Sequence, residues 1–191
     1  LFGARRIHEM KTTISTAIIS LSVLGLIIMA LGTVFAGPLL QLLGTDPDIM
    51  ADSELYLQIY FGGAVFLFLY NTLNGIYNAQ GDSKTPLIFL IISSLTNIVL
   101  DLLFVIQFDM RVAGVAWATL IAQGMCAVAS LIVMYRRMKR LPCEEGRENE
   151  KVPLFHMTAV RRIAQIGLPS MLQQSLVSLS MMMMQGLVNS Y

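Results

Sequence analysis

A single acidic residue, Asp101, lies within an apolar stretch that otherwise carries no charge from Thr85 to Phe108. Asn97 and Ser93 precede it by four and eight residues, so on a helix the three side chains would stack along one face. An ionised carboxylate at the centre of a membrane helix costs about 2.5–3.5 kcal/mol on insertion scales. We therefore expect Asp101 to face a cavity or a binding partner and not lipid.

The partner of Asp101 is not a base of a neighbouring apolar run, because none of the five such runs contains lysine or arginine. A proton, a bound cation, or a basic residue elsewhere in the protein remains. Such a site can exchange a proton for a metal ion or for a cationic substrate. The alternative is structural: a protonated carboxyl that is hydrogen-bonded to neighbouring helices.

Amide side chains form a second polar group on the preceding apolar run. Asn71, Asn74 and Asn78 fall within one helical sector that extends from mid-membrane to the inner end. This sector either lines a water-filled cavity or holds helices together through side-chain hydrogen bonds, each worth about 0.6–2 kcal/mol. On the fourth apolar run, Thr119 and Gln123 share one helical face.

Apolar helices must position these residues, and the composition is suited to them. The chain has 191 residues, of which 55% are hydrophobic and 13% charged, whereas soluble domains carry about 25% charged residues. Five apolar runs have the roughly 20 residues needed to cross a bilayer. They cover residues 14–43, 55–79, 86–107, 114–135 and 163–188. We predict an all-α, polytopic membrane protein built as a transmembrane helix bundle.

The charged connectors predict an orientation for this bundle. With the start of the chain, the GDSKTP turn and residues 136–162 in the cytoplasm, 12 of the 13 lysines and arginines lie inside, as the positive-inside rule requires. Residues 154–166 space apolar side chains along the segment with basic residues between them, which is typical of a helix in the membrane interface, and His156 is interpreted as an ordinary polar residue of it. The chain starts in a basic connector with Leu1 and not with an initiator methionine, and we interpret it as a fragment of a longer protein.

Four segments together resemble the multidrug and toxic compound extrusion (MATE) family of transporters: GDSKTPL, NIVLD, FDMRVAGVAWATLIAQ and RRIAQIGLPSMLQQ. The resemblance implies twelve helices in two six-helix lobes. Residues 1–135 would then contain helices three to six of the N-terminal lobe, residues 136–162 the cytoplasmic linker between the lobes, and residues 163–191 helix seven, the first of the C-terminal lobe. The first two helices and the rest of the C-terminal lobe would lie outside this chain.

The resemblance also implies an ion site. In the DinF-like branch of the family, a sodium or proton site would use Asn97, Asp101 and Thr119 together with an aspartate of the first helix, which lies outside this chain. If the ion is sodium, Asp101 and Asn97 would be its ligands. The fifth apolar run contains no acid, whereas the NorM-like branch carries a glutamate there, and this difference favours the DinF-like branch.

A substrate cavity in the same lobe is the second site that the resemblance implies. Asn74 and Gln123 would face this cavity, and we group Asn71 and Asn78 with them. The predicted ligands are small organic compounds, often cationic, and no nucleic-acid partner is expected.

Together, the buried acid and the resemblance predict a secondary antiporter, not an enzyme, that exports organic compounds in exchange for Na+ or H+. No cofactor other than the coupling ion is expected. The protein would cross the plasma (inner) membrane of a prokaryote several times, in contact with lipid. The alternative is a flippase of the same superfamily for lipid-linked oligosaccharides or polysaccharides. Flippases usually line their cavity with several charges, and the apolar runs offer one acid and no base.

Overall fold

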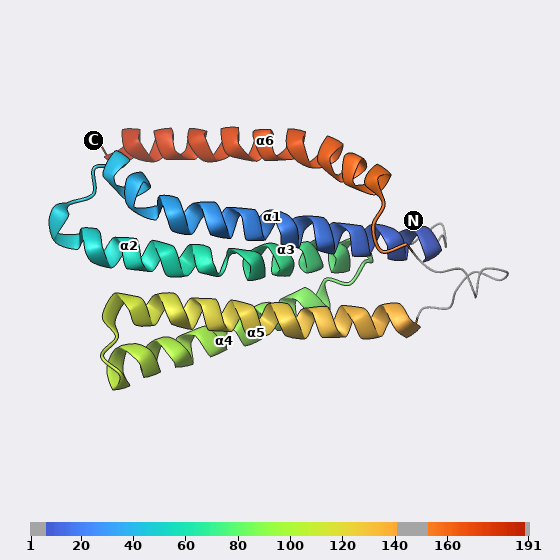
Figure 1. Ribbon diagram of the computed structural model, residues 1–191, viewed down its shortest axis with the longest axis horizontal. Helices are drawn as coiled ribbons and strands as arrows, with labels where there is room; N and C mark the ends of the chain where they lie inside the picture. The colour runs from blue at the N-terminus through green and yellow to red at the C-terminus, as the bar shows by residue number, and fades with distance from the viewer. Residues whose placement is uncertain (1–6, 141–152, 190–191) are drawn as a thin grey trace.

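The computed structural model describes residues 7–140 and 153–189 of the chain (Figure 1). It consists of α-helices and one π-helical segment, η1. In chain order these elements are α1 (Ile7–Leu42), α2 (Pro47–Gly62), α3 (Ala64–Ala79), α4 (Lys84–Leu102), η1 (Leu103–Gln107), α5 (Arg111–Arg140) and α6 (Met157–Asn189). The part of the chain that the structure describes has no strand, and the predicted all-α fold is confirmed.

Three helical segments are long and apolar enough to cross a membrane by themselves: α1, α4 continued through η1, and α5. α2 and α3 qualify together as one span that is bent by 46°. Among the described residues, α6 is 33 residues long but does not reach the same hydropathy, because glutamine and serine interrupt its apolar positions. The structure therefore has up to four spans on this criterion, and a fifth span over residues 163–188 remains a prediction.

The bend between α2 and α3 falls at Gly62 and Gly63. The N–H of Gly63 donates to the carbonyls of Ile59 and Tyr60 at 3.2 and 3.1 Å, so the backbone stays hydrogen-bonded through the change of direction. A Cβ on Gly63 would lie 3.4 Å from Leu120 of α5. The bend therefore lies against Leu120 of α5.

The helices pack around α1 and α5. α1 lies along α2 and α3, and α5 lies along α2, α3 and α4. α6 contacts α1, and Figure 1 shows it on the side of α1 that is opposite α4 and α5. The buried core centres on Leu73, Tyr77 and Met134, where α3 meets α5. Most other large apolar side chains are exposed, as expected for helices that are surrounded by lipid.

A tight connection joins α4 and η1 to α5. Asp109 and Arg111 adopt left-handed backbone conformations, with φ of 50° and 46°. A Cβ on Gly114 would lie 3.0 Å from the Cβ of Phe104, so a glycine is needed where α5 passes the π-helical segment. This hairpin brings the polar face of α4 against the first turns of α5.

Residues 154–166 differ from the expected interfacial helix. Residues 153–156 are not helical, and from Met157 a single helix continues to Asn189 with Pro169 inside it. Figure 1 shows the first turns of this helix bending towards the start of α1. The basic residues Arg161 and Arg162 therefore belong to the same helix as the apolar run that follows them.

Candidate functional site

Asn97 of α4 and Thr119 of α5 meet across the hairpin. Asn97 Nδ2 donates a hydrogen bond to Thr119 Oγ1 at 3.3 Å, and Thr119 Oγ1 donates to the carbonyl of Val115 at 3.0 Å. The threonine proton is thus used within α5, and its oxygen accepts from α4. Gln123, one turn further along α5, is also half-buried. The structure therefore brings two of the three predicted ion-site residues into direct contact.

Asp101 lies one helical turn after Asn97 and places a carboxylate oxygen out of contact with water. Its Oδ1 is buried and has no hydrogen-bond partner among the residues that the structure describes. An unpaired buried polar group costs about 1–3 kcal/mol, and a charged one costs more. A proton on the carboxyl, or a cation beside it, would remove this cost.

The donor set of this site suits a proton or a hard cation. It offers one carboxylate, one amide oxygen and one hydroxyl oxygen, and oxygen donors favour hard ions over transition metals. Within residues 7–140 and 153–189, no group of three or more histidine, cysteine, aspartate or glutamate side chains gathers around a possible metal position. Na+ and H+ fit the side chains that are present.

The structure gives the three asparagines of α3 different environments. Asn71 is exposed and its Nδ2 donates to the carbonyl of Leu67 at 2.8 Å, and Asn78 is exposed as well. Asn74 differs, because its Oδ1 is buried and finds no partner in the described ranges. The hydroxyl of Tyr70, one turn earlier, is in the same situation. Asn74 is therefore the member of this stripe that still requires a polar partner.

An ion pair joins the turn between α3 and α4 to the end of α5, and the sequence patterns gave no sign of it. Asp82 Oδ2 lies 2.6 Å from Arg137 Nη1 and accepts from Thr85 Oγ1 at 2.8 Å, while Oδ1 accepts from the Thr85 N–H at 3.1 Å. These Thr85 hydrogen bonds, and then Arg137, lower the pKa of Asp82 to about 2. Asp82, and not Ser83, caps α4, since the Ser83 side chain makes no capping bond. For the cap, although not for the ion pair, the sequence did contain a signal: an aspartate just before the start of a helix.

We expect Asp82→Asn to destabilise the full-length protein by about 0.5–1 kcal/mol, because asparagine can still cap α4 but loses the charge that pairs with Arg137, and Ser83→Ala to have little effect. Because the folded pKa of Asp82 lies below its ordinary 3.8, its stabilisation is present above about pH 4 and is lost as the pH falls towards 2. Thermal unfolding of wild type and Asp82→Asn between pH 2 and 7 measures this. An unchanged difference in Tm between pH 4 and pH 2 would contradict it.

Sequence similarity defines the class of protein to which this fold belongs. The MatE family profile matches residues 1–103, more than half of the chain. The chain therefore belongs to the MatE family and is a multi-pass membrane protein. The resemblance read from the GDSKTPL and NIVLD segments is confirmed.

Two bacterial relatives illustrate this membership. The chain is 34% identical over 189 residues to the "Probable multidrug resistance protein YpnP" of Bacillus subtilis, covering 99% of this chain and 41% of the relative. It is 26% identical over 177 residues to the "Multidrug export protein MepA" of Staphylococcus aureus, covering 93% and 38%. The chain thus spans about two fifths of the length of these curated relatives.

The fold also matches a solved structure, the inward-facing conformation of a multidrug resistance MATE family transporter of the MOP superfamily. The TM-score is 0.72 at 24% sequence identity, over 88% of this chain and 37% of the other. The helices described here are accordingly arranged as a part of the MATE transporter fold.

Proposed function

We propose that the full-length protein is a secondary antiporter of the plasma (inner) membrane that exports organic, often cationic, compounds in exchange for Na+ or H+. The observation that carries the proposal is the buried Oδ1 of Asp101, unpartnered within the described residues and one turn from the Asn97–Thr119 hydrogen bond. This acceptor lacks one partner, and a transported ion can supply it. The names of the relatives, a multidrug resistance protein and a multidrug export protein, support the substrate class.

In this mechanism Asp101 binds the coupling ion, and Asn97 and Thr119 supply neutral oxygens. Ion binding pairs the buried carboxylate and so stabilises the access state in which the three groups converge. Coupling requires the ion to bind the two access states with different affinity, because equal affinity shifts no equilibrium. An aspartate from a first helix outside this chain would complete the ligand set, as the DinF-like branch implies.

The proposed substrate cavity uses side chains of α3 and α5. Asn74 has an unpaired buried oxygen within the described part of the chain, and Gln123 is half-buried one turn from the ion site. Asn71 and Asn78 are exposed on α3 and are available to contact substrate between the two lobes. Amide groups of this kind can orient an organic cation without holding it as tightly as a carboxylate would.

The test is transport by the full-length protein in proteoliposomes. Vesicles that hold a fluorescent organic cation receive a Na+ gradient, a pH gradient or neither. We expect movement of the cation against its own gradient under one of the two ion gradients, and its loss when an ionophore collapses that gradient. The same rate with and without both gradients would contradict the antiporter. Translocation of a lipid-linked sugar, with no movement of the cation, would favour the flippase.

A further inference from the structure

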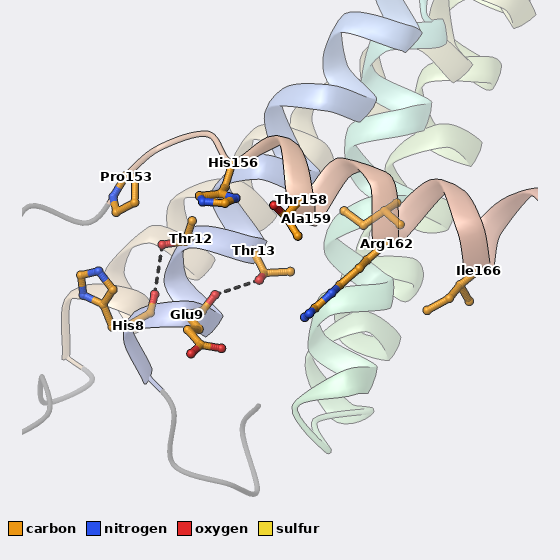
Figure 2. Close-up of a pocket in the computed structure, with 11 residues that line it drawn as sticks. His8, Glu9, Thr12, Thr13, Pro153, His156, Thr158, Ala159, Arg162 and Ile166 are labelled. Atoms are coloured by element: carbon orange, nitrogen blue, oxygen red, sulfur yellow. Dashed lines mark hydrogen bonds between the residues drawn. The ribbon is translucent and has the colours of Figure 1, made fainter.

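A pocket of about 500 Å³ lies between the start of α1 and the start of α6 (Figure 2). Figure 1 shows that both helix starts, together with the end of α3, lie at one end of the molecule. The positive-inside rule places this end at the cytoplasmic boundary of the membrane. The residues that give the pocket its chemistry are His8, Glu9, His156, Arg162, Ile163 and Ile166.

Hydrogen bonds between α1 and the segment before α6 fix the walls of this pocket. The N–H of His156 donates to Thr16 Oγ1 at 3.1 Å, and that hydroxyl donates to the carbonyl of Thr12 at 2.7 Å. Thr16 is fully buried. The contact joins residues 140 positions apart, and it holds the segment before α6 on α1 beside the pocket.

The pocket continues into an apolar groove of about 300 Å³ between α1, α3 and α6, with which it shares Thr13 and Ile163. Gln80, at the end of α3, lines this groove and is only 8% exposed. Neither its Nε2 nor its Oε1 has a hydrogen-bond partner within the described residues. The rest of the lining is mainly apolar: Met10, Ile14, Ala17, Ile76 and Ala79. An amide buried among such side chains requires a polar partner, and a ligand that enters the groove can supply it.

The charges at the mouth of the pocket are balanced. Apart from its two histidines, the lining carries one carboxylate, Glu9, and one guanidinium, Arg162. Figure 2 shows Arg162 reaching from α6 towards the side of α1 that carries Thr13 and Glu9. A guanidinium is well suited to a phosphate group, and a carboxylate accepts several hydrogen bonds at once, so Glu9 can take an ammonium group in addition to its existing interactions.

We propose that this composite pocket binds a zwitterionic phospholipid with a primary ammonium, of the phosphatidylethanolamine class, at the cytoplasmic boundary. Arg162 binds the phosphate, Glu9 binds the ammonium, Gln80 Nε2 donates to an ester oxygen of the glycerol, and an acyl chain lies along the groove. None of the residues that line the pocket and the groove belongs to the proposed ion and substrate sites. It would link α6 to α1 through a lipid.

The test uses the full-length protein purified in detergent, with Tm and retained lipid in native mass spectrometry as readouts. Phosphatidylethanolamine is compared with monogalactosyldiacylglycerol of the same acyl chains, which lacks phosphate, and with soluble O-phosphoethanolamine. We expect one retained phosphatidylethanolamine and a rise in Tm of a few degrees, and neither effect with the other two compounds. Equal stabilisation by the galactolipid, or by the soluble headgroup at the same concentration, would overturn the proposal.

Two variants with a matched control locate the site. Arg162→Gln should lose most of the rise in Tm, whereas Arg161→Gln, at an exposed neighbour outside the pocket lining, should keep it. Ala159→Phe, which fills the pocket and leaves its charges intact, should also lose the bound lipid. If Arg162→Gln fails to fold, Ala159→Phe and the lipid series on the wild-type protein decide whether the pocket binds the lipid. Retention of lipid by Ala159→Phe, or equal behaviour of the two arginine variants, would refute this location.

Discussion

Replacing Asp101 with asparagine in the full-length protein should reduce gradient-driven export to the level of empty vesicles, a loss of at least about 10-fold. Asparagine has nearly the same shape, but it neither carries a charge nor releases a proton, so the ion no longer distinguishes the two access states. The variant should fold with an unchanged or higher Tm, because a neutral amide costs less to bury than a carboxylate. Ion-driven efflux in proteoliposomes and the Tm in detergent measure the two effects.

Asp109→Asn is the matched control for this substitution. Asp109 lies on the same hairpin but is exposed, and its φ of 50° is a conformation that asparagine tolerates well. We expect wild-type export from this variant. Wild-type export from Asp101→Asn would remove Asp101 from the mechanism, and equal losses in both variants would point to a general effect of charge.

Tyr77→Ala should have the largest effect on stability, lowering the free energy of unfolding by about 3–5 kcal/mol. Tyr77 is fully buried against Leu73 and Met134, and its hydroxyl donates to the carbonyl of Ser130 at 3.0 Å. Truncation would leave a cavity between α3 and α5 and would remove the hydrogen bond that joins Tyr77 to α5. Chemical unfolding of the full-length protein in mixed micelles measures the change.

Two further tyrosine variants separate the contributions at this contact. Tyr77→Phe keeps the ring and loses only the hydroxyl, so we expect a loss of about 1 kcal/mol. Tyr135→Ala, at a tyrosine of α5 that is 55% exposed, should change stability by about 0.5 kcal/mol or less. If Tyr77→Ala costs no more than Tyr135→Ala, the contact between α3 and α5 is not the core of this bundle.

The helices and the polar face of α4 could be predicted because each depends on one segment. Hydropathy over about 20 residues indicates a membrane helix, and a spacing of four residues places Asn97 and Asp101 on one face. The contact between Asn97 and Thr119 joins two helices, and spacing within one helix carries no information about it. Thr119 was assigned to the same site as Asn97 only because of the resemblance to a family.

The features that could not be predicted depend on tertiary packing. Asp82 and Arg137 are 55 residues apart, and no periodicity connects them. The apolar run over residues 55–79 gave no indication of a break at Gly62 and Gly63, because glycine is also common in continuous membrane helices. The contact of this bend with Leu120 becomes visible only in the fold. The exposure of Asn71 and Asn78 likewise depends on how α3 is rotated against its neighbours.

The π-helical segment η1 determines how many negative charges the polar face of α4 presents. In an uninterrupted α-helix, with about 100° per residue, Asp109 would lie about 80° around the helix axis from Asp101, at the edge of the face that carries Asn97 and Asp101. The wider winding over Leu103–Gln107, followed by a left-handed residue at 109, changes the helical phase, and Asp109 is exposed. The face therefore ends with one carboxylate, and any second negative charge at the proposed ion site has to come from another helix.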